Sequence, residues 1–283
     1  MRNGLPLKRD GIEYLLWRHP LANGEVTTVY AVRYPSRSTR VRVVYFPRPE
    51  RLDVWCRRNG VEEAVVGGFF LRDPYRPLGE LWIDGRPERH EPISPPYGHR
   101  RSCVVIEEGD VRLVARAVAP SRPAGDLLQA GPMLVAGGVV VFDADEDDEG
   151  FSAGAGQFDS DITEGRYPRA ALGISEESLV AVACDGRRSN VDGGLSMIEL
   201  AEVMAELGAE SAINLDGGGS TTLVHRGHLL NRPYSTQDQP APASRRVVNA
   251  LAFEPGSPTP GSRRARDEAQ RRGSGGGDAA RRG

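Results

Sequence analysis

Residues 213–223 read INLDGGGSTTL, an apolar run that ends in Asp216, three glycines and three hydroxyl side chains. Glycine loses more backbone entropy on folding than any other residue, so three in a row are a poor choice for the interior of a helix or strand. They are useful where a ligand or another chain segment approaches the backbone closely. The stretch therefore predicts a turn at the end of a buried strand, with Asp216 at its start.

An amphipathic helix is predicted just before this turn. Residues 196–207 read SMIELAEVMAEL, in which apolar side chains recur at three- and four-residue spacing. Ser196 and Glu199 have the spacing of a capping box, and Gly208 follows the last turn as a stop signal. The order of helix, short strand and glycine turn indicates that the strand delivers Asp216 to one edge of a sheet.

Two other predicted strands end in a similar way. Residues 65–70 read VVGGFF and residues 182–187 read VACDGR, so each strand ends in glycine and one also carries Asp185. If the three strands are neighbours, their ends converge at one edge. Consecutive N–H groups in glycine turns can bind anions. Backbone donors to a phosphate or a sugar are therefore expected from Gly67, Gly68, Gly217, Gly218 and Gly219.

Common nucleotide and hydrolase motifs do not match the glycine turn. GGGSTT has no lysine before its hydroxyl residues, which excludes a phosphate-binding P-loop. No GxGxxG opens a helix, so a dinucleotide-binding fingerprint is absent. No GxSxG is present either, which excludes the nucleophile elbow of the α/β-hydrolases.

The rest of the pattern predicts one domain over residues 11–255. Residues 26–46 form two alternating, β-branched runs joined by a PSRS turn, and further short strands follow them. We expect an α+β fold with a mixed β-sheet core and flanking helices. Residues 256–283 are rich in Arg, Gly, Pro and Ser and lack any aliphatic side chain larger than alanine, which predicts a disordered tail.

Composition excludes several classes of protein. Hydrophobic residues are 39% and charged residues 27% of the 283, as in ordinary globular proteins, and the net charge of −3 gives no reason to expect nucleic acid or an anionic membrane as a partner. No apolar run approaches the ~20 residues of a membrane span. No signal peptide is recognised, so a cytoplasmic location is expected. The three cysteines are scattered and predict buried, reduced thiols.

No metal site is predicted. Residues 143–149 hold six acids, but an EF-hand loop that starts at Asp143 needs glycine at its sixth position and glutamate at its twelfth. Asp148 and Gly154 stand there, so a solvated acidic loop is expected. His225 and His228 form an HxxH without a nearby third ligand, which favours ordinary strand or turn histidines. No cofactor is predicted, and the spacing does not support a divalent cation.

Six segments in order resemble the phosphodiester glycosidase family over about residues 64–253. They read VVGGFF, QAGPMLV, RAALGI, VACDGR, GLSMIELAEVMAELGAESAINLDGGGSTTL and RRVVNAL. NLDGGGST after an amphipathic helix is the most specific, and RRVVNAL is the second. The resemblance implies hydrolysis of a sugar-1-phosphodiester between the anomeric carbon and a phosphate oxygen. Many members have Arg-Thr-Ala where this chain has Arg-Ala-Ala at 169–171, so one hydroxyl contact to the ligand is in doubt.

The residues and the resemblance together assign two carboxylates and one arginine. Asp216 is the candidate that acts at the sugar, because a carboxylate stabilises or attacks an oxocarbenium-like centre; the alternative is an Asp that only caps the glycine turn. Asp185 is the second carboxylate, either as a base or to orient a sugar hydroxyl, and otherwise a turn residue. Arg169 is expected to clamp the phosphate, or else to form a surface salt bridge.

Three further side chains are assigned to substrate binding. Ser220 and Thr221 would supply hydroxyl groups to the ligand. Asn249, in VVNAL, is expected either to hydrogen-bond in the same cleft or only to tie down the final strand.

Two rival functions remain open at this point. A non-catalytic module that binds a carbohydrate or phosphosugar would keep the cleft without turnover, whereas the presence of both Asp185 and Asp216 favours an enzyme. A metal-dependent phosphodiesterase would cut the P–O bond instead. A sugar phosphate or glycan is the expected partner in each case, and the sequence predicts no oligomeric state.

Overall fold

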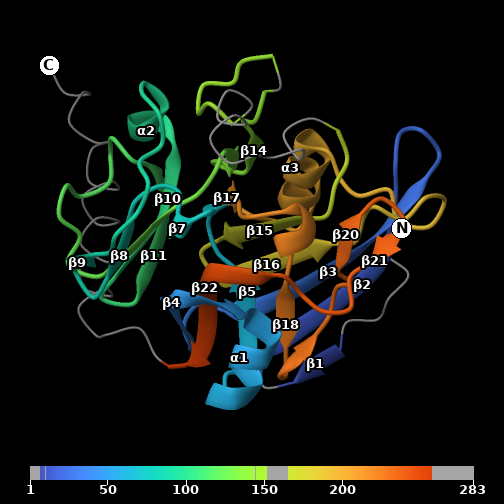
Figure 1. The fold of residues 1–283 in the computed structure, drawn as a ribbon, viewed down its shortest axis with the longest axis horizontal. Coiled ribbons are helices and arrows are strands. Elements are labelled where there is room, and N and C mark those ends of the chain that lie inside the picture. Colours follow the sequence, from blue (N-terminus) through green and yellow to red (C-terminus); the bar gives the residue numbers. More distant parts are fainter. Residues whose placement is uncertain (1–6, 10, 144, 152–164, 257–283) are drawn as a thin grey trace, which may run out of the picture.

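The computed structural model of the chain describes residues 7–9, 11–143, 145–151 and 165–256. Apart from Gly256, the predicted tail lies outside the described residues. Three sheets and two small hairpins make up most of the regular secondary structure in this part of the chain (Figure 1). Every pair of strands within them is antiparallel.

The largest sheet has eight strands. Their order is β1 (Leu7–Arg9), β2 (Ile12–Pro20), β3 (Val26–Pro35), β16 (Ser178–Cys184), β15 (Arg169–Ile174), β17 (Ser211–Asn214), β13 (Met133–Ala136) and β14 (Val139–Val140). A five-stranded sheet follows the order β19 (His228–Leu229), β18 (Leu223–His225), β5 (Glu63–Val66), β22 (Arg246–Pro255) and β4 (Thr39–Arg51).

The third sheet also has five strands. Its order is β11 (Asp110–Ala115), β10 (Ser102–Glu107), β12 (Asp126–Gln129), β8 (Leu81–Ile83) and β9 (Arg86–Pro87). The two hairpins are β6 (Phe70–Arg72) with β7 (Tyr75–Pro77), and β20 (Tyr234–Thr236) with β21 (Gln239–Pro240).

The alternation of side chains along β3 shows how the layers pack. Tyr30, Val32 and Tyr34 enter a core shared with the β19–β18–β5–β22–β4 sheet. Val29 and Ala31, from the other face, enter a core shared with helix α3 (Met197–Glu206). Because successive side chains of a strand point to opposite faces, the eight-stranded sheet is buried on both sides.

Helix α3 confirms the helix predicted at 196–207. The Ser196 hydroxyl accepts a hydrogen bond from the Glu199 amide at 3.2 Å, and the Glu199 carboxylate accepts one from the Ser196 amide at 2.9 Å, so the capping box is complete. The helix buries Leu200 and Met204 against the sheet. This packing fixes the direction in which β17 leaves toward Asp216.

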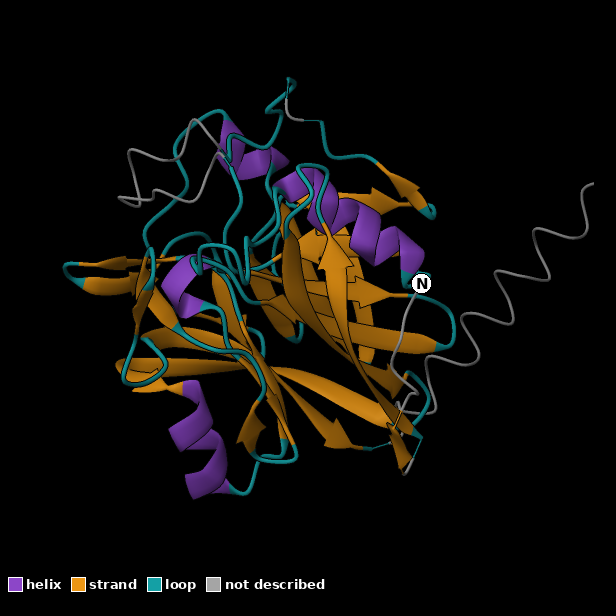
Figure 2. Ribbon diagram, turned by 90° about the vertical axis from the view of Figure 1, so that its right-hand side faces the viewer, coloured by secondary structure: helices purple, strands orange, loops and turns teal. Residues whose placement is uncertain are grey.

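The predicted α+β fold with a mixed β-sheet core and flanking helices is wrong. The sheets are antiparallel, and one face of the eight-stranded sheet is covered by another sheet rather than by helices. The other two α-helices of the described residues are short, α1 (Leu52–Asn59) and α2 (Tyr97–Arg100), and strands dominate the view in Figure 2. Sheet-on-sheet packing buries the apolar faces for which flanking helices had been expected. In the described part, no helix has the length and apolar character to cross a membrane.

Candidate active site

Strand β15 brings two of the predicted strand ends to one edge of the large sheet. It pairs with β16, where Arg169 is opposite Cys184, and with β17, where Ala171 is opposite Asn214. Because both pairings are antiparallel, the chain leaves β16 and β17 at the same edge, where β15 begins. Asp185 and Asp216 therefore follow at this edge on either side of Pro168, whose carbonyl accepts the Gly218 amide at 2.8 Å.

Asp216 is buried at the start of the glycine turn. Its amide donates to the Gly67 carbonyl at 2.8 Å, so the third predicted strand end, that of β5, meets it directly. Its carboxylate accepts the Gly217 amide at 2.9 Å and the Ser220 hydroxyl. Burial raises the pKa of Asp216 to about 6, although these donors and the positive charges of Arg245 and Arg72 act in the opposite direction.

Asn249 fixes the Gly67–Gly68 segment. Its side-chain oxygen accepts the Gly68 amide at 2.6 Å, and its carbonyl accepts the Gly67 amide at 3.2 Å. A Cβ atom at Gly67 would lie 2.1 Å from the Asn249 oxygen, so only glycine lets the amide approach this closely. The Nδ2 atom of Asn249 is buried without a hydrogen-bond partner. Asn249 thus ties the final strand to the segment that contacts Asp216.

The three glycines of the turn serve close packing more than anion binding. The Gly217 amide is used by Asp216 and the Gly218 amide by Pro168, as those of Gly67 and Gly68 are used by Asn249. Gly218 has φ +58°, a conformation that favours glycine. A Cβ atom at Gly219 would lie 2.5 Å from a guanidinium nitrogen of Arg245. Among the described residues, the Gly219 amide has no acceptor.

Arg245 is the main site residue that sequence reasoning missed. Its guanidinium is half-buried against Gly219, and it makes no hydrogen bond or ion pair with any described residue. Burial lowers the pKa of Arg245, whereas the charge of Asp216 raises it. The sequence signal that could have identified Arg245 is its place in RRVVNAL, the second most specific segment of the family resemblance. Within this segment, the sequence analysis names only Asn249 as a site residue.

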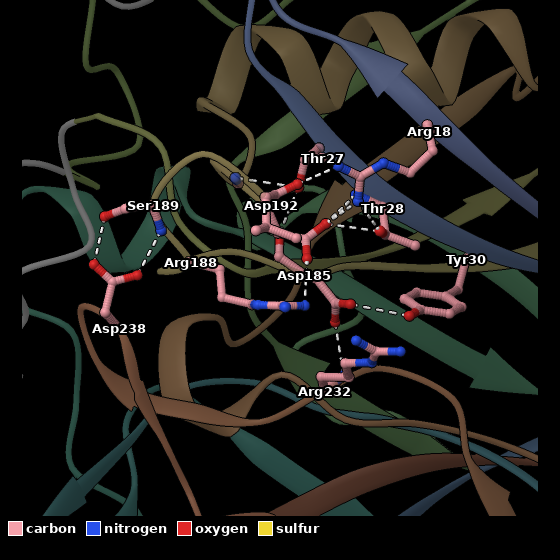
Figure 3. Close-up of polar contacts among 12 residues, drawn as sticks. Arg18, Thr27, Thr28, Tyr30, Asp185, Arg188, Ser189, Asp192, Arg232 and Asp238 are labelled. Atoms are coloured by element: carbon pink, nitrogen blue, oxygen red, sulfur yellow. Dashed lines mark hydrogen bonds and ion pairs between the residues drawn. The ribbon is translucent and has the colours of Figure 1, made fainter.

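Asp185 is held by neighbours on two sides (Figure 3). The Tyr30 hydroxyl donates to one carboxylate oxygen at 2.9 Å and the Arg232 amide to the other at 2.6 Å. Burial raises the pKa of Asp185 to about 6, partly offset by these two hydrogen bonds. Both predicted carboxylates therefore have a pKa close to the range in which a general acid or base works well.

Asp192 supports the backbone of Asp185 through Thr28. Its carboxylate accepts the Thr28 amide at 2.9 Å and the Thr28 hydroxyl at 2.7 Å, and it pairs with Arg18 at 2.5 Å (Figure 3). The Thr28 carbonyl in turn accepts the Asp185 amide at 2.9 Å. Asp192 therefore fixes the backbone on which Asp185 sits, a role that the sequence pattern did not reveal.

Arg169 is fully buried at this edge. It is 1% exposed, and its guanidinium donates to the carbonyls of Leu195 at 3.0 Å and Gly165 at 3.2 Å. The guanidinium groups of Arg169 and Arg187 each lie 5.7 Å from the ring centroid of Tyr167. Burial lowers the pKa of Arg169 to about 10. The predicted phosphate clamp thus lies beneath the edge, and its role stays a prediction.

Ser220 and Thr221 are the two residues predicted to supply hydroxyl groups to the ligand. The Ser220 hydroxyl donates a hydrogen bond to the Asp216 carboxylate. Thr221 is 2% exposed, and its hydroxyl oxygen is buried without a hydrogen-bond partner. Sequence alone could not separate the two, because both are hydroxyl residues next to the same turn.

The described ranges contain no group of three His, Cys, Asp or Glu side chains that could hold a metal ion. His225 is buried and lies 2.9 Å from the Glu63 carboxylate, whereas His228 is exposed. Glu149, the last acid of the 143–149 run, accepts the amides of Ser102 at 2.7 Å and Met133 at 2.8 Å. The prediction of a protein without a cofactor stays a prediction.

Substitution of Gly67 by alanine tests the packing beside Asp216. The new methyl group would displace the Asn249 amide, so we expect Gly67→Ala to lower the free energy of unfolding by about 2 kcal/mol. Chemical denaturation measures this loss. In Gly67→Ala/Asn249→Ala, where the obstructing amide is absent, the loss should be smaller than the sum of the two single losses. Strict additivity would show that the two residues do not pack as described.

Comparisons with known proteins bear on the family and the fold of this chain. A family model described as phosphodiester glycosidase matches residues 59–254. The N-acetylglucosamine-1-phosphodiester alpha-N-acetylglucosaminidase of Mus musculus is 30% identical over 199 residues, which are 62% of this chain and 36% of the mouse protein. The chain thus spans about a third of the length of this curated relative.

Two solved structures share the fold. The catalytic domain of zebrafish N-acetylglucosamine-1-phosphodiester alpha-N-acetylglucosaminidase, auto-inhibited by its pro-peptide, matches with a TM-score of 0.64 and 20% identity over 86% of this chain and 82% of that one. A hypothetical protein from Synechocystis matches with a TM-score of 0.58 and 19% identity over 86% of this chain and 62% of that one.

Proposed function

Because this chain belongs to the phosphodiester glycosidase family, we propose that it hydrolyses the bond between the anomeric carbon of a sugar and a phosphate oxygen of a sugar-1-phosphodiester. The names of the mouse and zebrafish relatives suggest N-acetylglucosamine as the sugar. The observation that carries the proposal is the unpaired guanidinium of Arg245 next to the buried carboxyl group of Asp216.

A phosphodiester anion suits this position. A half-buried cation without a partner is costly, and a bound anion removes that cost. Arginine binds phosphate oxygens with two parallel hydrogen bonds, and the amide of Gly219 has no acceptor among the described residues. We assign the phosphate to Arg245 and the Gly219 amide, which places the anomeric carbon on the side of Asp216.

Asp216 acts at the anomeric carbon in this proposal. As the C1–O bond breaks, its electron pair leaves with the phosphate, and the ionised Asp216 carboxylate stabilises or attacks the oxocarbenium-like centre. Water supplies the hydroxyl group at C1, and Asp185 accepts the proton that this water loses. The products are a free reducing sugar and a phosphomonoester.

Product analysis tests the proposal against its rivals. The protein is incubated with the methyl diester of N-acetylglucosamine-1-phosphate, and the sugar products are separated. Free N-acetylglucosamine supports the proposal. N-acetylglucosamine-1-phosphate, with loss of activity in chelator, would instead indicate a metal-dependent phosphodiesterase, and tight binding without turnover would indicate a binding module.

The pH dependence of kcat/KM should show an acid limb near pH 6. Both carboxyl groups have a pKa of about 6 and must lose their protons to act as proposed, so activity rises with pH through this range. The Tyr30 hydroxyl lowers the pKa of Asp185 only. If Asp185 sets the acid limb of kcat/KM, Tyr30→Phe should therefore move this limb to higher pH. A limb that stays in place belongs to Asp216, and a profile that is flat from pH 5 to 7 contradicts both assignments.

A further inference from the structure

The open edge of the largest sheet has no role in the chemistry proposed above. Strand β14 is the last strand on this side, and among the described strands it pairs with β13 alone. The Val141 amide donates to the Leu134 carbonyl at 3.0 Å, so it faces β13. Because successive amides of a strand point in opposite directions, the amide and carbonyl of Val140 face away from β13, toward the open edge.

Apolar side chains are exposed along this edge. Val139 is 64% exposed and Val141 is 48% exposed. They are two of the six large apolar side chains that the described residues expose, and a third, Ile198, lies on helix α3, which contacts β14. An exposed apolar edge strand is a template on which another chain segment can pair. The clustering therefore indicates a surface that another segment covers.

Acidic side chains continue the same surface. Asp143, Asp145 and Glu146 follow β14 in the chain and are exposed. No described basic side chain pairs with Asp145 or Glu146, whereas Arg100 lies 3.6 Å from Asp148. A cationic partner would therefore find carboxylates here that the described residues do not neutralise. We refer to this surface as the acidic edge, made up of Val139, Val141, Asp143, Asp145 and Glu146.

Arginine is the side chain that fits an apolar strip beside carboxylates. Its methylene groups can lie along the valines while the guanidinium reaches the acids. Guanidinium groups also bind carboxylates with two parallel hydrogen bonds. The acidic edge of a second copy fits less well, because like charges would then face each other across the paired strands.

The chain carries such arginines after its last strand. Residues 257–283 hold seven arginines, no lysine and three acidic side chains. They follow Gly256, whose amide donates to the Ser38 carbonyl at 3.0 Å directly after β22. In Figure 1 the end of β22 lies near the bottom of the molecule and β14 near the top.

The segment is long enough to connect these two places. A domain of this size is about 45 Å across, so a path around half of its surface is roughly 70 Å long. An extended chain advances about 3.3 Å per residue, which gives about 85 Å between Gly256 and Arg282.

We propose that residues 271–282 of this chain dock on the acidic edge, with arginine stems over Val139 and Val141 and guanidinium groups on the carboxylates that follow. In this arrangement the segment covers the open edge of the sheet and prevents its pairing with another copy. The inference does not depend on the proposed hydrolase activity.

Disulfide trapping in the full chain tests the inference. Val139→Cys/Ala280→Cys places one thiol on the acidic edge and one beside Arg281, and the native cysteines are buried. Val118→Cys/Ala280→Cys is the matched control, because Val118 is 74% exposed and lies outside the acidic edge. With oxidised glutathione at low salt, we expect the intrachain disulfide to form about tenfold faster in the first variant. The advantage should vanish in 1 M salt, where charges more than about 3 Å apart are screened.

Charge reversal on the surface separates docking from chance encounters. Asp145→Lys/Glu146→Lys, added to the first variant, should remove its tenfold advantage. Glu176→Lys/Glu177→Lys changes the net charge by the same amount on two exposed residues between β15 and β16, and it should leave the advantage intact.

The outcomes distinguish the possible occupants of the acidic edge. Equal rates of intrachain disulfide formation in the first variant and its control overturn the docking. Covalent dimers in place of the intrachain disulfide would assign the edge to the segment of a second copy, and they overturn the assignment to the same chain. An advantage that survives Asp145→Lys/Glu146→Lys overturns recognition by charge.

Discussion

Asp216→Asn should fold like the parent chain and lose kcat/KM on a sugar-1-phosphodiester by a factor on the order of 10⁴. The asparagine keeps a side-chain oxygen for the Gly217 amide, so the turn can retain its shape. It lacks the negative charge that stabilises or attacks the anomeric centre. Steady-state kinetics with purified protein measure the loss, and circular dichroism verifies the fold.

An exposed carboxylate provides the control. Asp238 accepts hydrogen bonds from Ser189 (Figure 3) and has no role in the proposed chemistry. Asp238→Asn should therefore keep kcat/KM within twofold. Activity of Asp216→Asn within a few-fold of the parent would remove Asp216 from the mechanism.

The pH dependence of the free energy of unfolding provides a second test of the Asp216 carboxyl group. Because the pKa of Asp216 is about 6 in the folded chain, above its usual value near 4 when unfolded, the folded state holds this proton more tightly. The contributions of Asp216 and Asp185 to the free energy of unfolding therefore fall as pH rises from about 4 to 6. Asp216→Asn lacks the contribution of Asp216, so between about pH 4 and 6 its free energy of unfolding should lose less with rising pH than that of the parent chain.

The local pattern was sufficient to predict the elements that deliver the site. A capping box, helical spacing and a stop glycine predicted helix α3, and apolar runs that end in glycine predicted the ends of β5, β16 and β17. These signals lie within a few residues of one another, so backbone preference alone specifies them. The contact between Asp216 and Gly67 does not follow from strand pairing, because β17 and β5 belong to different sheets.

The fold class could not be read in the same way. Alternation along a strand shows that a face is buried, but it does not show whether a helix or a second sheet covers that face. The alternating pattern of Tyr30, Val32 and Tyr34 would be the same whether a helix or a sheet covered them. Their partners come from β4, the next strand along the chain, and from β5 and β22, which lie farther away in sequence, and only the assembled chain identifies them.

The groups that pack against the glycines could not be predicted for a related reason. Glycine allows both a ligand and a protein group to approach the backbone, and the motif GGG does not distinguish the two. The neighbour of Gly67 is Asn249 and that of Gly219 is Arg245, both from the C-terminal end of the domain. The same long-range packing explains why the position of Arg245 beside the glycine turn was not predicted.

Arg245→Ala should reduce kcat/KM on the phosphodiester about 100-fold while it leaves the free energy of unfolding unchanged or slightly higher. The guanidinium forms no ion pair with a described residue. The charge of Asp216 favours it, but burial and the charges of Arg72 and Arg187 disfavour it, so its removal costs the fold little. The loss should fall mainly on the charged substrate. An uncharged aryl glycoside should lose only a few-fold, and Arg245→Lys should recover part of the activity on the diester.

Arg246 offers a matched control, because it is adjacent in sequence and exposed, and its guanidinium donates to the Pro49 carbonyl at 3.1 Å. Arg246→Ala should keep kcat/KM within twofold on both substrates. The pH profile gives an independent check: Arg245 lowers the pKa of Asp216, so Arg245→Ala should move the limb that belongs to Asp216 to higher pH. Equal losses on the charged and uncharged substrates, with no movement of the limb, would show that Arg245 does not hold the phosphate.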